Sequence, residues 1–145
     1  MINAPVLIDT GPLGRLVHPN TTSNRDITSW FIRLLDTGVV FVLPEIADYE
    51  TRRSLILQGF SWSIARLDRL KADLQYLPLT TETMLKAADL WATARRLHRQ
   101  TAGNDALDGD VILAAQALQV GGMVVTENIG HLGLFVEAKT WREID

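Results

Sequence analysis

The 145-residue sequence contains no cysteine, and this absence removes several kinds of site. Without cysteine there is no disulfide framework, no thiolate zinc site and no cysteine nucleophile. The N-terminus also lacks the basic segment followed by an apolar one that marks a secretory signal. These two absences favour a protein of the cytoplasm.

Long apolar runs are missing as well. The longest runs, such as residues 39–43 and 111–115, are far too short to cross a bilayer, so no membrane association is expected. Positive charge is not in excess either: the sequence has 14 Lys and Arg residues and 17 Asp and Glu residues, which gives a net charge of −3. A nucleic-acid-binding protein usually has a basic surface. However, acidic residues gathered in a metal site would lower the net charge without removing a basic rim.

The remaining composition is that of a globular protein, with 47% hydrophobic and 21% charged residues. At this length we expect a single domain over residues 1–145, large enough for a central sheet with helices on both faces. The hydrophobic periodicity alternates between apolar runs and helical patterns, which predicts an α/β fold with a mostly parallel sheet. The expected helices cover a segment after Thr10, residues 25–36, 44–58, 61–75, a stretch from 80 or 81 to about 99, a mostly buried helix that contains 111–118 and ends at Gly121-Gly122, and a short segment within 129–135; the expected strands cover 6–8, 39–43, 76–79, 123–126 and 136–144.

Two of these expected elements have further consequences. The two helices within residues 44–75 are separated by Gly59 and should form a helical hairpin. In the helix from 80 or 81 to about 99, apolar residues recur at helical spacing, which predicts that the whole stripe belongs to the core. The stripe comprises Met84, Ala87, Ala88, Trp91, Ala94 and Leu97.

The first strand provides the clearest candidate functional residue. Residues 6–8 form an uninterrupted apolar run, typical of a strand buried on both faces, and the run stops at Asp9. In open α/β sheets, ligands bind at the carboxyl ends of the strands, where Asp9 is expected to lie. Thr10 and Gly11-Pro12 fit the turn into a following helix. Asp9 is therefore either a ligand-binding carboxylate or the cap of that helix.

Glu50 is a second candidate. In the predicted helix 44–58 it shares a ridge with Ala47, Ser54 and Leu57, on or beside the face that meets the sheet. A carboxylate in that position is costly unless it is paired or bound to a metal. A salt bridge to Arg53, or to an arginine from elsewhere in the fold, is the alternative explanation.

A third group of acidic residues precedes the nearly all-apolar segment 111–118. Asp108 has a structural reason to be there, because helix N-termini favour acidic side chains. Asp110 instead falls in step with the apolar residues Leu107 and Ala114, so it should point where they point. After the strand 123–126, the polar residues Thr126, Glu127 and Asn128 reach the same sheet edge, whereas His131 is expected to be a surface or capping residue.

These carboxylates should converge on one edge of the sheet. Two carboxylates about 4 Å apart repel by roughly 4 kcal/mol at an effective dielectric of 20, so the cluster needs a proton or a cation. Oxygen ligands suit Mg²⁺ or Mn²⁺, which retain waters and take only a few carboxylates from the protein. Such an ion can polarise a phosphoryl oxygen and activate water.

The order of these segments resembles the PIN-domain family, and within it the VapC-type toxins of bacterial toxin-antitoxin pairs. The resemblance covers nearly the whole chain. Its segments are Leu7-Ile8-Asp9-Thr10-Gly11-Pro12-Leu13, Leu43-Pro44-Glu45-Ile46 with Tyr49-Glu50, Asp110-Val111-Ile112-Leu113-Ala114-Ala115-Gln116-Ala117-Leu118 and Val124-Val125-Thr126-Glu127-Asn128. It implies a PIN-like three-layer α/β/α sandwich and a Mg²⁺- or Mn²⁺-dependent endoribonuclease that leaves a 5′-phosphate.

The resemblance also implies roles for individual residues. Asp9, Glu50 and Asp110 match the acidic triad of the family, as metal ligands and catalytic residues. The family's frequent fourth acidic position appears here as Asn128 beside Glu127, which leaves open whether one or two metals bind. Thr10 and Thr126 are possible supporting residues, and Asp108 is the substitute for Asp110. The implied partners are an RNA substrate, a cognate antitoxin and a second copy of the chain.

A non-catalytic alternative remains open. A PIN-like regulatory or RNA-binding module would keep a metal-binding acidic pocket but cut nothing, and Asn128 together with the acidic balance favours it. The presence of all three of Asp9, Glu50 and Asp110 favours the nuclease. A phosphatase of the haloacid dehalogenase type is excluded, because it needs a second Asp two residues after the first and this sequence has Gly11 there.

Overall fold

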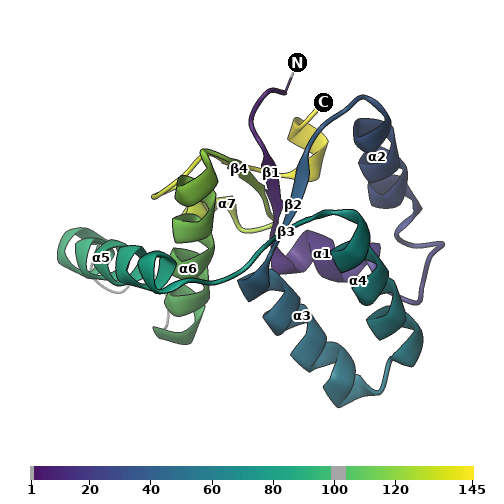
Figure 1. Cartoon of the computed structure of the whole chain (residues 1–145), viewed down its shortest axis with the longest axis horizontal. Helices are drawn as coiled ribbons and strands as arrows, with labels where there is room; N and C mark the ends of the chain where they lie inside the picture. The colour runs from purple at the N-terminus through teal and green to yellow at the C-terminus, as the bar shows by residue number, and fades with distance from the viewer. Residues whose placement is uncertain (1, 99–103) are drawn as a thin grey trace.

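A five-stranded parallel sheet forms the centre of the computed structural model, which describes residues 2–98 and 104–145 (Figure 1). The strand order is β3-β2-β1-β4-β5, and every neighbouring pair is parallel. Strand β1 therefore lies in the middle, between a strand that follows it closely in sequence and one from the far end of the chain. The strands are β1 (Val6–Ile8), β2 (Phe41–Pro44), β3 (Gln75–Leu77), β4 (Met123–Val125) and β5 (Ala138–Lys139).

Helices cover both faces of the sheet and make three layers. On one face, α1 (Thr10–Leu16) and α2 (Arg25–Asp36) bury their apolar residues against Val6 and Ile8 of β1. On the other face, Leu7 packs with residues of α6 (Asn104–Val120) and α7 (Ile129–Leu132). Because successive strand residues point to opposite faces, the short run 6–8 supplies both cores. The α/β sandwich expected from the sequence is confirmed.

Two further helices follow β2. Helix α3 (Glu45–Gln58) begins directly after Pro44 and ends at Gly59, whose φ of 71° is the left-handed conformation that glycine adopts most easily. Helix α4 (Ser61–Asp73) then returns alongside α3 before β3 (Figure 1). Since α3 starts at the carboxyl end of β2, its first turns lie at the same sheet edge as Asp9.

Helix α5 (Thr81–His98) packs mainly on α6, outside the sheet (Figure 1). The prediction that its whole apolar stripe is core is therefore wrong in part: Ala87 and Ala94 are buried, but Met84 is 44% and Leu97 69% exposed. With a single helix as its main neighbour, α5 buries only a narrow seam. The predicted end of this helix near Arg99 lies outside the described residues. No helix in residues 2–98 and 104–145 is long and apolar enough to span a membrane.

The C-terminal segment also differs from the expectation. The predicted edge strand over 136–144 is limited to the two residues of β5. Thr140 and Glu143 then form a capping box, in which the Glu143 carboxylate accepts hydrogen bonds from the backbone N–H and the hydroxyl of Thr140. This local bonding competes with strand pairing, so the chain turns into the 3₁₀ helix Trp141–Glu143. Trp141 packs against the core on the face of the sheet that α1 and α2 cover.

Candidate active site

Asp9 lies at the carboxyl end of β1, where the strand order reverses direction between β2 and β4. Such a switch point is the usual ligand site of an open α/β sheet. The backbone N–H of Thr10 donates to Oδ1 of Asp9 at 2.7 Å, and the hydroxyl of Thr126 donates to Oδ2 at 2.7 Å. Asp9 is thus the cap of α1 and also a carboxylate fixed at the sheet edge. The capping explanation is confirmed, and ligand binding by Asp9 stays a prediction.

Thr126 joins the carboxyl ends of β1 and β4. Its side chain is fully buried, and its hydroxyl oxygen accepts a hydrogen bond of 2.9 Å from the backbone N–H of Asn128 while donating to Asp9. The hydroxyl hydrogen therefore has one fixed direction. This arrangement orients the Asp9 carboxylate from the end of β4.

Glu50 reaches the same edge from the second turn of α3. The hydroxyl of Thr10 donates to Oε1 of Glu50 at 2.8 Å, so one threonine contacts Asp9 through its backbone and Glu50 through its side chain. Arg53 lies 3.9 Å from Oε2 of Glu50, and the side chain of Glu50 is 26% exposed. Glu50 therefore makes the ion pair anticipated as the alternative and also faces the carboxylate cluster.

Asp110 approaches from α6 and is the least satisfied carboxylate of the group. Its Oδ2 is buried and has no hydrogen-bond partner, although Nδ1 of His131 lies 3.5 Å away. The pKa of Asp110 is raised to about 6, chiefly by burial and then by the nearby charges of Asp9 and Glu50, while His131 acts to lower it. Burial also raises the pKa of Asp9, against the lowering effect of its two hydrogen bonds. Removing these carboxylates from water favours a bound proton or cation.

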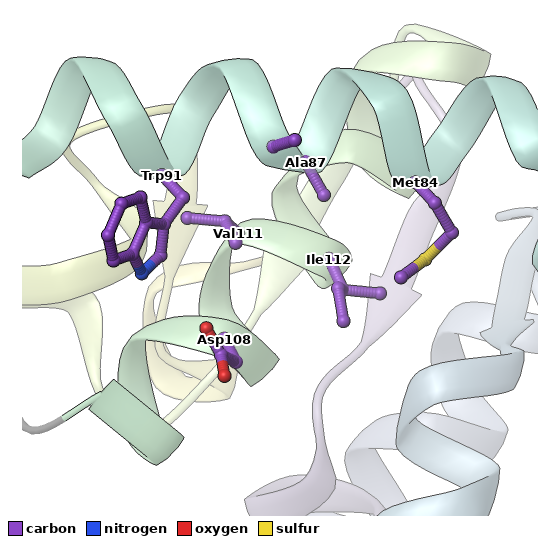
Figure 2. A pocket seen from close by; sticks show the side chains of 7 residues that line it. Met84, Ala87, Trp91, Asp108, Val111 and Ile112 are labelled. Carbon is purple, nitrogen blue, oxygen red and sulfur yellow. The ribbon is translucent and has the colours of Figure 1, made fainter.

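Asp108 and Glu127 lie apart from this cluster. Asp108 is exposed and faces α5, where it borders a mostly apolar cavity of about 370 Å³. Figure 2 shows Met84, Ala87 and Trp91 of α5 lining this cavity opposite Val111 and Ile112 of α6.

Glu127 is half-exposed and forms an ion pair of 3.3 Å with Arg15 of α1. Its charge still acts on Asp9, since it contributes to the raised pKa of that residue. The Arg15 guanidinium also donates to the side-chain oxygen of Asn24 at 3.1 Å. An arginine is therefore fixed beside the acidic cluster, on the side of α1.

His131 is a neighbour of the site that the sequence interpretation missed. It was expected to be a surface or capping residue, but it lies beside Asp110, and its Nδ1 is 2.9 Å from Nδ2 of Asn128. Asn128 thus contacts a histidine, and not the carboxylates, with its amide. The spacing of three residues between Asn128 and His131 was the available signal, because it places both on one side of the short helix α7.

The donor set is compatible with a hard divalent cation. In the part of the chain that the structure describes, no three histidine or acidic side chains are already gathered as a metal cage. Magnesium does not require one, because it keeps several waters and takes only one or two protein carboxylates. The buried, unpartnered Oδ2 of Asp110 beside Asp9 is the orphaned acceptor that such an ion would satisfy.

A cavity of about 440 Å³ adjoins the cluster on the side of α1 and α3. Thr10 and Glu50 line it, and Arg15, His18 and Phe60 also contribute to its walls. Of the three carboxylates, Glu50 thus borders a cavity that also contains a cation, Arg15, and an aromatic ring, Phe60.

Comparisons with known proteins give structural matches alone. No protein-family model and no curated protein sequence matches the chain. A chain of VapBC2 from Rickettsia felis, solved bound to a DNA fragment from its promoter, is 15% identical and superposes with a TM-score of 0.73, covering 94% of this chain and 98% of that one. Those two chains thus agree over almost their whole lengths.

Two other structures agree with this result. A chain of FitAcB from Neisseria gonorrhoeae is 21% identical with a TM-score of 0.69, covering 96% of this chain and 99% of that one. A chain of VapBC-1 from nontypeable Haemophilus influenzae is 17% identical with a TM-score of 0.67, covering 95% and 98%. The chain has a PIN-like α/β fold. At these identities the shared property is the fold, and this PIN-like fold places Asp9, Glu50 and Asp110 at one sheet edge.

Proposed function

We propose that this chain is a metal-dependent endoribonuclease of the PIN-domain family and the toxin of a toxin-antitoxin pair. The observation that carries the proposal is the buried, unpartnered oxygen of Asp110 next to Asp9, at the switch point of a PIN-like sheet. In purely structural sites the large majority of buried polar oxygens have a hydrogen-bond partner. A site that binds a cation gives that oxygen a function.

In this proposal Asp9 and Asp110 hold a Mg²⁺ or Mn²⁺ ion, directly or through its waters, with Glu50 as a third ligand or as the base. When bound, the ion supplies Lewis acidity toward a phosphoryl oxygen and a water of lowered pKa. Glu50 orients and deprotonates the water that attacks the phosphodiester, which leaves a 5′-phosphate. Thr10 fixes Oε1 of Glu50 and Thr126 fixes Oδ2 of Asp9, so both carboxylates are oriented before substrate binds.

Two arginines lie beside this cluster and suit a polyanionic substrate. Arg15 and Arg53 are ion-paired with Glu127 and Glu50, and their side chains are 32% and 58% exposed. Each retains donors that face solvent, and guanidinium groups bind phosphate well. The net negative charge of the chain therefore does not prevent binding of RNA at this edge.

We propose an antitoxin and a second copy of the chain as protein partners. The matched structures are the complexes VapBC and FitAB, each solved with more than one component. The helical hairpin of α3 and α4 offers exposed apolar side chains to a partner, since Leu57 is 87% and Ile56 62% exposed. Light scattering of the purified chain, alone and after co-expression with the protein encoded by the adjacent gene, measures both associations. A chain that is strictly monomeric would contradict the homodimer.

The activity is tested by incubating the purified protein with a mixed RNA pool and Mg²⁺ or Mn²⁺, with EDTA as one control. Asp9→Asn, checked for folding by circular dichroism, is the second control. We expect cleavage that requires the metal and is lost in the variant, with 5′-phosphate ends on the products. Intact RNA at high protein and metal concentration, or equal cleavage by Asp9→Asn, would contradict the nuclease and favour a non-catalytic PIN-like module.

A further inference from the structure

Gly109 occupies an unusual position, inside α6 and directly before Asp110. A glycine within a helix destabilises the helix relative to alanine, so its presence needs a local reason. A Cβ atom built on Gly109 would lie 2.8 Å from Oε2 of Glu50, a separation that real Cβ atoms do not show. The carboxylate of Glu50 therefore occupies space that any other residue at position 109 would fill.

The Glu50 carboxylate is confined on its other sides as well. Its Oε1 accepts the hydrogen bond from Thr10 of α1, and its Oε2 lies 3.9 Å from Arg53 on its own helix. Three helices, α1, α3 and α6, thus meet around one carboxylate. The end of a glutamate side chain is flexible, so a Cβ at position 109 would displace Oε2 and leave the backbone in place.

We propose that Gly109 is a positioning residue that acts through Glu50. Its missing side chain lets the Glu50 carboxylate lie against α6, beside Asp110 and across from Asp9. This inference rests on the proposed function for its catalytic consequence, but the steric relation between Gly109 and Glu50 holds in the metal-free protein. Gly109 is thus retained at the expense of helix stability because the site needs Glu50 in that place.

Two other helical glycines show what is particular to Gly109. A Cβ on Gly11 would lie 3.1 Å from Oε2 of Glu127, a longer separation than at Gly109 and to a side chain that is half-exposed. A Cβ on Gly14, in the same helix as Gly11, would have nothing within 4 Å. Gly14→Ala is therefore the matched control for the effect of helix propensity on stability.

Thermal unfolding without metal tests the steric relation first. Gly14→Ala should raise the Tm by about 3 °C in both the wild-type and the Glu50→Ala background. Gly109→Ala should raise the Tm by the same amount, about 3 °C, only in the Glu50→Ala background. When Glu50 is present, the rise in Tm should be smaller by at least about 2 °C. An equal gain in both backgrounds would show that the two residues do not compete for space and would overturn the proposal.

Manganese affinity, measured by calorimetry, tests the consequence for the site. We expect Gly109→Ala to bind Mn²⁺ about tenfold more weakly than wild type, and the double variant to bind no more weakly than Glu50→Ala. Wild-type affinity in Gly109→Ala, or an added loss in the double variant, would show that Gly109 does not act through Glu50. If the wild-type protein binds no Mn²⁺, the metal-dependent function fails, and the unfolding comparison still decides the relation between Gly109 and Glu50.

Discussion

Asp108 and Asp110 are two residues apart on α6, yet they belong to different regions of the molecule. Asp110 has its Oδ2 buried near the other carboxylates at the sheet edge, whereas Asp108 is exposed beside the apolar cavity between α5 and α6. Each residue turns an α-helix by about 100°, so positions two apart point to nearly opposite sides. Whether a carboxylate lies in the candidate site therefore depends on whether its side chain points toward the strand ends, and not on its place in an acidic segment.

The largest expected effect separates these two residues. Asp110→Asn should lower the rate of RNA cleavage by at least about 100-fold, because the proposed cation loses a charged ligand. Asp108→Asn should change the rate by less than about twofold, since its side chain faces solvent and α5. Initial rates at saturating Mg²⁺ measure both. Comparable losses in the two variants would mean that Asp108 also serves the site and would end the distinction between the regions.

The second prediction concerns the support of Asp9. Thr126→Val removes the hydroxyl that donates to Oδ2 of Asp9 at 2.7 Å while keeping the shape of the side chain. Mn²⁺ affinity should fall about 10- to 100-fold, as expected for a residue that orients a metal ligand. Thr126→Ser retains the hydroxyl and should stay close to wild type in the same calorimetric titration. Equal losses in both variants would point to packing, and not the hydrogen bond, as the reason.

A third prediction uses the pKa of Asp110, which is raised from 3.8 to about 6. Because the ion binds the ionised carboxylate, Mn²⁺ affinity should fall about tenfold between pH 7 and pH 5. The metal-free protein should show the opposite trend: the folded state holds this proton more tightly than the unfolded state, so the contribution of Asp110 to stability declines as the pH rises from about 4 to 6. Calorimetry and urea unfolding measure the two trends.

The control for this pH dependence is Asp110→Asn, which cannot ionise. Between pH 4 and pH 6, the free energy of unfolding of this variant should decline less than that of the wild-type protein, because the contribution of Asp110 is missing. If the two proteins follow the same curve, Asp110 titrates near its ordinary pKa. Burial and the charges of Asp9 and Glu50 would then have little effect on the protonation of Asp110.

The smallest expected effect lies in the other region. Met84→Ala trims a side chain that is 44% exposed at the α5–α6 cavity, so the free energy of unfolding should fall by less than about 1 kcal/mol. Mn²⁺ affinity and RNA cleavage should not change. Urea unfolding and the cleavage assay check this. A large loss of cleavage would connect the cavity to the catalytic site.

The candidate site could be predicted to a large extent because it follows from strand ends. Asp9 and Thr126 each come directly after a short apolar run, and parallel strands place such positions at one edge. Asp110 could be separated from Asp108 by its phase relative to Leu107 and Ala114. Local sequence patterns therefore sufficed wherever a side chain's direction is fixed by its own strand or helix.

The remaining features depend on what other elements contribute. Gly109 has no side chain to signal its contact with Glu50, which is 59 positions earlier in the sequence. His131 meets Asp110 only because α7 packs on α6. The exposure of Met84 and Leu97 depends on how many neighbours α5 has, which a periodic pattern does not encode. These are tertiary effects, and single-sequence patterns do not contain them.

The central position of β1 has a consequence for the time at which the site forms. Asp9 leaves the ribosome early, but its hydrogen-bond partner Thr126 is 117 residues further along the chain. β4 must pair with β1 before the two side chains meet, and contacts of such long sequence separation form slowly. A nascent chain that lacks β4 has all three proposed catalytic carboxylates without the architecture that assembles them. The proposed ribonuclease would in this way stay inactive until most of its own chain has been synthesised.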